Sequence, residues 1–218
     1  MVKIVKYTVA LIALPSAVAV SRSFYEELFR INYFAANMNM FLWGIVLYML
    51  FHILIIKPMF LYTWGHEVIH VLATWVCGGH VTSFHVGEGG GSVATSKTNV
   101  FIELSPYFIP TYTLLLVVAM PLFGFKNTPV FIQSAYIFLI GFSLGMHLIM
   151  TAVMMKTKQP DIVKSGYAFS LVLIYIANLI IVFLLFALLS KEVTLKYFFL
   201  KSWLYTKDIY LVLFRRFF

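Results

Sequence analysis

Cysteine and charged residues are both scarce in this sequence of 218 residues. Cys77 is its one cysteine, which excludes an internal disulfide and any zinc site built from several cysteines. Only 11% of the residues are charged, whereas about 25% is typical of soluble domains. Because 62% of the residues are apolar, the composition predicts a polytopic membrane protein rather than a soluble domain.

Acidic residues are the scarcer charge, with 8 Asp and Glu against 16 Lys and Arg, for a net charge of +8. In a soluble protein this excess would indicate nucleic-acid binding. Here the basic residues flank hydrophobic segments, where they mark the cytoplasmic side and meet anionic lipid headgroups. We therefore expect membrane lipids, and no nucleic acid, among the partners.

Hydropathy predicts five spanning helices, at 40–56, 60–77, 107–122, 130–155 and 166–189. Only Lys57-Pro58 separates the first two, so we expect these two to be antiparallel neighbours. A sixth candidate, Tyr7–Val20, is short and contains Pro15, and its Ala17-Val18-Ala19 resembles a signal-peptidase site. We interpret it as an uncleaved anchor or interfacial helix, with a signal peptide as the alternative.

Two further segments complete the predicted fold. Between residues 78 and 95, two β-branched runs separated by glycines predict a β-hairpin, and a plain loop fits equally well. Residues 191–218 interleave basic and aromatic side chains, which is typical of an interfacial amphipathic helix. The prediction is an all-α polytopic membrane protein with five or six spans. Its parts are an N-terminal anchor and polar loop (1–39), a membrane core (40–190) and a basic tail (191–218).

The pentapeptide His66-Glu67-Val68-Ile69-His70 lies inside one predicted span. On a helix, histidines four residues apart project from one face and can bind one zinc ion, with the glutamate beside the metal as a general base. Ionisable groups in a membrane cost roughly 2.5 kcal/mol or more each, so three within five residues need a compensating partner. The motif therefore predicts a zinc site with hydrolase chemistry. The alternatives are a hydrogen-bonded polar network between helices or a site that has lost its activity.

A catalytic zinc site usually has three protein ligands, so one ligand remains to be found. Asp161 is preferred, because it follows Pro160 near a predicted helix start from which its carboxylate could reach a neighbouring helix. A helix N-cap explains the same residue equally well. The other candidates are Glu103, His147, Glu88, His80 and His85, of which His147 also fits an interhelical hydrogen bond.

Four segments make the chain resemble the site-2 protease family of intramembrane zinc metallopeptidases, specifically its compact bacterial members. They are HEVIH, the glycine-rich segment that begins at Gly78, Ser-Pro-Tyr-Phe-Ile-Pro at 105–110, and Gln-Pro-Asp-Ile at 159–162. The resemblance implies that His66, His70 and Asp161 bind Zn²⁺ and that Glu67 is the catalytic base. The family's second motif usually has glycine after its aspartate, where this chain has isoleucine, and no PDZ insertion is recognisable.

The resemblance thus predicts a zinc metalloendopeptidase of a prokaryotic cytoplasmic (inner) membrane, acting on membrane-spanning or membrane-associated proteins. The distribution of basic residues places the C-terminus in the cytoplasm. The rival prediction is a non-catalytic scaffold subunit, or a metal-binding or transport protein, on the same helices. A transporter should carry polar residues along a continuous path, whereas here they concentrate around HEVIH, His147 and Asp161, which favours a single site.

Overall fold

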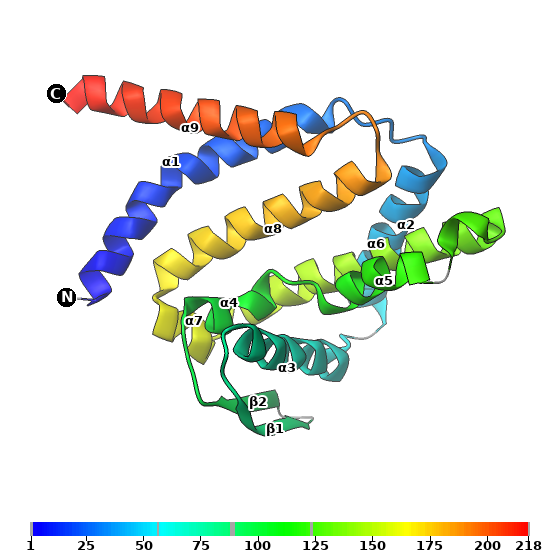
Figure 1. Ribbon diagram of the computed structural model, residues 1–218, viewed down its shortest axis with the longest axis horizontal. Helices are drawn as coiled ribbons and strands as arrows, with labels where there is room; N and C mark the ends of the chain where they lie inside the picture. The colour runs from blue at the N-terminus through cyan, green and yellow to red at the C-terminus, as the bar shows by residue number, and fades with distance from the viewer. Residues whose placement is uncertain (1, 56, 88–89, 123, 218) are drawn as a thin grey trace. The chain divides into compact units, whose positions relative to one another are not determined.

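The computed structural model describes residues 2–55, 57–87, 90–122 and 124–217 (Figure 1). Most of them are helical. The helices are α1 (Val2–Leu28), α2 (Ala36–Leu54), α3 (Met59–Val76), α4 (Val100–Leu104), α5 (Thr111–Leu122), α6 (Val130–Met154), α7 (Pro160–Ser165), α8 (Tyr167–Leu189) and α9 (Leu195–Phe217). Two 3-10 turns, η1 (Ser105–Tyr107) and η2 (Phe125–Asn127), and two strands, β1 (Val81–Gly87) and β2 (Gly90–Thr95), complete the described part.

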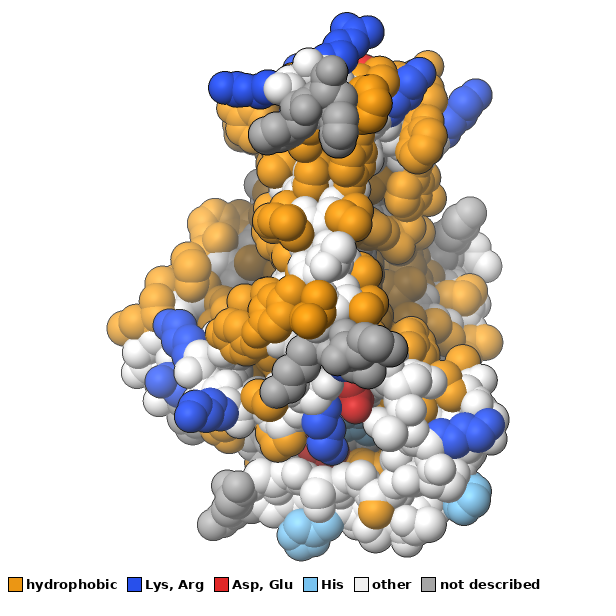
Figure 2. Space-filling model, turned by 90° about the vertical axis from the view of Figure 1, so that its left-hand side faces the viewer, with side chains coloured by type: hydrophobic (Ala, Val, Ile, Leu, Met, Phe, Trp, Pro, Cys, Tyr) orange, Lys and Arg blue, Asp and Glu red, His pale blue; other side chains and the backbone are white. Residues whose placement is uncertain are grey.

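Among the described residues, four helices are long and apolar enough to cross a membrane: α1 from Ile4 onward, α2, α6 and α8. A fifth span results if α4, η1 and α5 are one span broken by an 82° bend. Much of the face in Figure 2 is covered by apolar side chains, as expected for a surface in lipid. The polytopic all-α class is confirmed on this basis. The HEVIH helix α3 is not among the candidate spans, because its histidines and glutamate lower its hydropathy.

Helix α1 is longer than the sequence indicated. It runs through Pro15 to Leu28, so much of the predicted polar loop before residue 39 is helical. An ion pair between Arg22 and Glu26, one turn apart at 3.2 Å, favours helix in this part. The span is therefore a full-length candidate rather than a 14-residue fragment.

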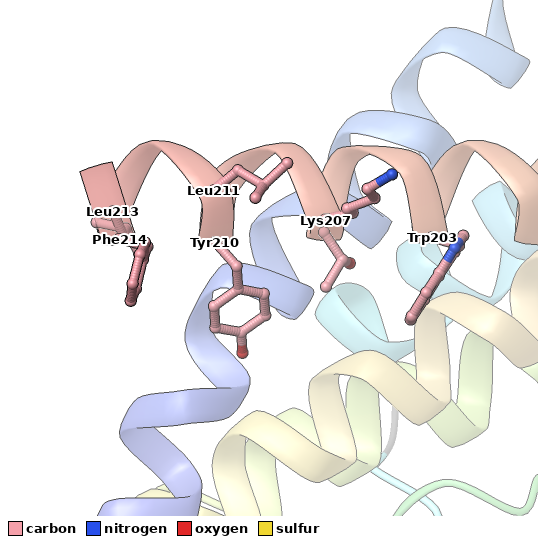
Figure 3. A pocket seen from close by; sticks show the side chains of 7 residues that line it. Trp203, Lys207, Tyr210, Leu211, Leu213 and Phe214 are labelled. Atoms are coloured by element: carbon pink, nitrogen blue, oxygen red, sulfur yellow. The ribbon is translucent and has the colours of Figure 1, made fainter. Parts of the chain in front are cut away.

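One compact unit contains residues 1–33 and 164–218, and in it α1 packs against α8 and α9. The Phe24 ring of α1 lies against Phe183 and Phe186 of α8. The predicted tail is helical as α9, with Trp203, Tyr210 and Phe214 on one side of it (Figure 3). Its location at the membrane surface stays a prediction. This unit joins α1 to the last two helices, whereas the sequence-based division separated them.

The second compact unit contains residues 34–163, and its main helix pair is α2 with α6. A Cβ atom on Gly44 would lie 2.1 Å from the Phe138 carbonyl oxygen, and one on Gly141 would lie 1.9 Å from that of Phe41. These backbones are in direct contact, as small residues permit between membrane helices. The predicted pairing of α2 with α3 is therefore wrong, because the glycine surfaces bring α2 against α6 instead.

Helix α3 is surrounded by the hairpin, α4, η1, α5 and α6. The predicted hairpin is confirmed: β1 and β2 pair antiparallel, from Val81 with Thr95 to Gly87 with Gly90, with an irregularity between Val81 and Ser83. The side chain of Thr111 donates a hydrogen bond to the Gly65 carbonyl oxygen at 2.9 Å. The broken helix pair α4–α5 is thus fixed to α3 one residue before HEVIH.

Candidate metal centre

The HEVIH residues lie in the middle of helix α3. Their spacing of four residues places the His66 and His70 rings on one face, with centroids 4.9 Å apart. Glu67 and His70 are buried, with 6% and 9% of their surfaces exposed. The helix therefore presents two imidazoles to the interior of the unit, as the motif predicted.

Asp161 lies close to both histidines. Its Oδ2 atom is 3.3 Å from His70 Nε2 and 3.9 Å from His66 Nε2. Potential ligand atoms of the three side chains all lie within 4.8 Å of one another. Tetrahedral ligands with bonds of 2.0–2.1 Å are about 3.4 Å apart, so the separation from His70 already fits. We use the name metal centre for His66, His70 and Asp161, the group that could hold a metal ion.

The alternative interpretation of Asp161 as a helix N-cap does not describe this geometry. Helix α7 begins at Pro160, so Asp161 lies inside its first turn and its carboxylate is directed toward the histidines. Burial by itself would raise the pKa of Asp161, but the interactions with His66 and His70 hold that pKa below its ordinary value. The carboxylate is therefore in the anionic form that a metal ligand requires.

A backbone carbonyl of the broken helix determines which nitrogen of His70 faces Asp161. His70 Nδ1 lies 2.8 Å from the Ile102 carbonyl oxygen. A carbonyl only accepts, so Nδ1 must carry the hydrogen, and the neutral ring then keeps the lone pair on Nε2. Metal-binding histidines are usually held by such a hydrogen bond from their second nitrogen.

The donor set fits zinc. Two imidazole nitrogens and one carboxylate oxygen form a standard catalytic ligand set for that ion, which keeps a fourth position for water. His66 Nδ1 is buried and has no hydrogen-bond partner among the described residues. No Lys or Arg within the described ranges forms an ion pair with Asp161. Within the described residues the centre therefore contains electron-pair donors without a Lys or Arg to balance them.

Strand β2 passes directly over Glu67. A Cβ atom on Gly91 would lie 2.5 Å from Glu67 Cγ and 2.7 Å from Glu67 Oε1. Only glycine allows the strand backbone to approach the carboxylate so closely. The hairpin and the predicted catalytic base are therefore in contact, which the sequence alone did not indicate.

None of the other described candidate ligands belongs to the metal centre. His80 and His85 are exposed on the hairpin, and Glu103 accepts a hydrogen bond from Thr98. His147 is buried beside His66, where both line a small cavity with Ser143 and Thr111, but it is not in the ligand group. Glu88 lies outside the described residues.

Sequence reasoning missed the contribution of residues 102–111 to the site. It considered Glu103 as a possible ligand but assigned no role to Ile102, Tyr107 or Thr111. The Ile102 carbonyl oxygen accepts a hydrogen bond from His70, and the Thr111 hydroxyl donates one to Gly65. Tyr107 contacts both His66 and Asp161. The prolines were the available signal, since an interrupted helix at membrane depth is tolerated where it is buried in protein or lines a cavity.

No protein-family profile, curated protein sequence or solved structure matches this chain. The assignment of the candidate site therefore depends on the geometry of this chain alone.

Proposed function

We propose that this protein is an intramembrane zinc metalloendopeptidase of the site-2 protease type. One observation carries the proposal: His66, His70 and Asp161 converge beside Glu67 in a chain with several candidate membrane spans. Charged groups in such a chain are costly unless they are paired with opposite charges or serve a site. A prokaryotic cytoplasmic membrane, with the C-terminus in the cytoplasm, belongs to the same proposal.

In this proposal His66, His70 and Asp161 hold the zinc ion. When bound, zinc supplies a Lewis acid that polarises a carbonyl group and lowers the pKa of a water molecule toward about 7. Glu67 accepts the proton of the attacking water as the C–O bond forms. It then donates that proton to the amide nitrogen as the C–N bond breaks, which leaves a carboxylic acid and an amine.

The substrate class follows from the setting of the site. A membrane-spanning or membrane-associated protein would have to unwind locally, because the carbonyl groups of a helix are already hydrogen-bonded. The described sheet has only two strands, so each strand has one edge without a strand partner. Such an edge can hold an extended peptide by backbone hydrogen bonds. The contact between β2 and Glu67 would bring that peptide to the catalytic base.

The zinc content of purified protein tests the metal centre. We expect about one zinc per wild-type chain and a large loss in His66→Ala and Asp161→Ala. His85→Ala is the matched control, since His85 is an exposed histidine of the hairpin. Equal zinc in all four proteins would contradict the proposed ligand set.

Peptidase activity needs its own measurement. Wild-type protein in liposomes should cleave some members of a library of single-span peptides, with cleavage sites found by mass spectrometry. Bound zinc without any cleavage would favour the rival, a metal-binding scaffold or transport protein.

A further inference from the structure

Tyr107 contacts two of the three residues of the metal centre. It ends the turn η1 between the two halves of the broken helix, and it is fully buried, with 0% of its surface exposed. We infer that Tyr107 is a positioning residue: its hydroxyl orients the Asp161 carboxylate, and its ring fixes the His66 imidazole. This inference depends on the proposed metal centre and adds a residue to it.

The hydroxyl of Tyr107 donates a hydrogen bond to Asp161 Oδ2 at 3.5 Å. That oxygen is the same one that faces His66 Nε2 and His70 Nε2. A carboxylate in a six-residue helix such as α7 can rotate about its side-chain bonds, and a donor on one oxygen restricts this rotation. Hydrogen bonds around such sites are often long in the ligand-free protein, so this length is compatible with the role.

The ring of Tyr107 contacts His66 independently of the hydroxyl. The two ring centroids are 4.9 Å apart and the rings are nearly perpendicular, at 85°. This edge-to-face arrangement is a favourable one for aromatic rings. His66 Nδ1 has no hydrogen-bond partner among the described residues, so no hydrogen bond there orients its imidazole, whereas Ile102 orients that of His70. Packing against the Tyr107 ring therefore orients the His66 imidazole, as the hydrogen bond to the Ile102 carbonyl oxygen orients that of His70.

The backbone around Tyr107 is fixed on both sides. Pro106 precedes it within the turn, and Ile102 and Thr111 attach the flanking helices to α3 through His70 and Gly65. The proline ring locks the backbone just before Tyr107, and complete burial restricts the Tyr107 side chain. The broken helix thus positions Tyr107 against His66 of α3 and Asp161 of α7.

Two substitutions separate the hydroxyl from the ring. Tyr107→Phe removes only the hydroxyl, and Tyr107→Leu removes the ring contact as well. The matched control is Tyr62→Phe, because Tyr62 is also buried near His66 but its hydroxyl pairs with Thr151 at 3.1 Å. The readouts are the zinc dissociation constant, from competition with a chelator, and the visible absorption spectrum of the Co²⁺-substituted protein. Neither depends on peptidase activity.

We expect Tyr107→Phe to weaken zinc binding about 10-fold, as is common when a residue supporting a metal ligand is removed. Its Co²⁺ spectrum should differ from that of the wild type, and Tyr107→Leu should lose more affinity than Tyr107→Phe. Tyr62→Phe should match the wild type in both readouts. Wild-type affinity and spectrum in Tyr107→Phe would overturn the role of the hydroxyl, and equal affinities in the Phe and Leu variants that of the ring. A wild-type chain that binds neither metal would overturn the proposed function itself.

Discussion

Two groups of acidic side chains are buried or partly buried in this protein, one in each compact unit, and their surroundings differ. In the unit of α1, α8 and α9, Glu26 and Glu27 lie among basic side chains. In the unit of residues 34–163, Glu67 and Asp161 lie among histidines. We call the first group the ion cluster; its members are Arg22, Glu26, Glu27, Arg30 and Lys201.

Basic side chains compensate both carboxylates of the ion cluster. Lys201 Nζ lies 3.0 Å from Glu27 Oε1 and 3.3 Å from Glu26 Oε2, and Arg22 and Arg30 approach the same two carboxylates. The hydrogen bond to Glu27 raises the pKa of Lys201, so the ammonium group stays charged. Each acid thus has two basic neighbours, and a buried charge such as that of Glu27 generally requires such partners. This cluster joins α1 to α9, and its chemistry is structural.

The described residues of the metal centre include no Lys or Arg paired with its carboxylate. Its carboxylate faces two imidazoles, whose nitrogens can donate lone pairs to a metal ion. The broken helix orients these groups toward one another instead of neutralising them. The comparison teaches that a buried acid by itself does not indicate a site. The identity of its neighbours separates a structural ion pair from a place for a metal ion.

The largest effect should come from Glu67→Gln. Removing the general base should lower peptidase activity by at least about 100-fold, while zinc content stays that of the wild type. The measurement is the rate of peptide cleavage in liposomes together with the zinc content. Glu26→Gln in the ion cluster is the matched control and should retain activity. Undiminished cleavage by Glu67→Gln would remove this residue from the mechanism.

In contrast to Glu67→Gln, we expect Glu27→Gln to lower the stability of the protein and to leave the metal centre nearly unchanged. Glu27 is fully buried, but its partners Lys201 and Arg30 are partly exposed, so we expect about 2 kcal/mol rather than the 3–5 kcal/mol of a fully buried pair. Unfolding in detergent micelles measures this. Asp208→Asn, an exposed acid of α9, is the control. A lower zinc content in Glu27→Gln would argue against the separation of the two groups.

Gly91→Ala should displace Glu67 without changing any of the three proposed metal ligands. The new methyl group would overlap Glu67 Cγ at 2.5 Å, so strand or side chain must move, and we expect cleavage to fall about 10-fold with zinc retained. Gly87→Ala is the matched control within the hairpin, because its Cβ would meet its nearest neighbour at 3.5 Å. Equal rates for both variants would show that the contact between β2 and Glu67 has no role in catalysis.

The smallest effect should come from Tyr205→Phe. The Tyr205 hydroxyl donates to both Glu26 oxygens, at 2.7 and 2.8 Å, at the edge of the ion cluster. Because Glu26 keeps its basic neighbours, we expect a loss of about 1 kcal/mol or less in the free energy of unfolding. Thermal unfolding measures the change. A loss larger than that of Glu27→Gln would show that the hydroxyl, and not the ion pairs, holds this cluster.

Local sequence patterns predicted those features of the fold that neighbouring residues determine. The hairpin followed from β-branched runs and glycines, and the two histidines from a spacing of four on a helix. The ion pair of Arg22 with Glu26 was equally local and could have been found, but the polarity of that segment was interpreted as a loop. The partners Glu27 and Lys201 could not have been found, because 174 residues separate them.

By itself the sequence determined the membrane class, the HEVIH helix and the basic tail, because composition and short periodic patterns govern these features. It offered the hairpin beside a plain loop. It offered Asp161 as one of several possible ligands. Only the tertiary structure brought Asp161 to the histidines, Tyr107 to both, Gly91 to Glu67 and α2 to α6. Each of these contacts joins residues from different helices or strands, and packing, which depends on the whole chain, decides which surfaces meet.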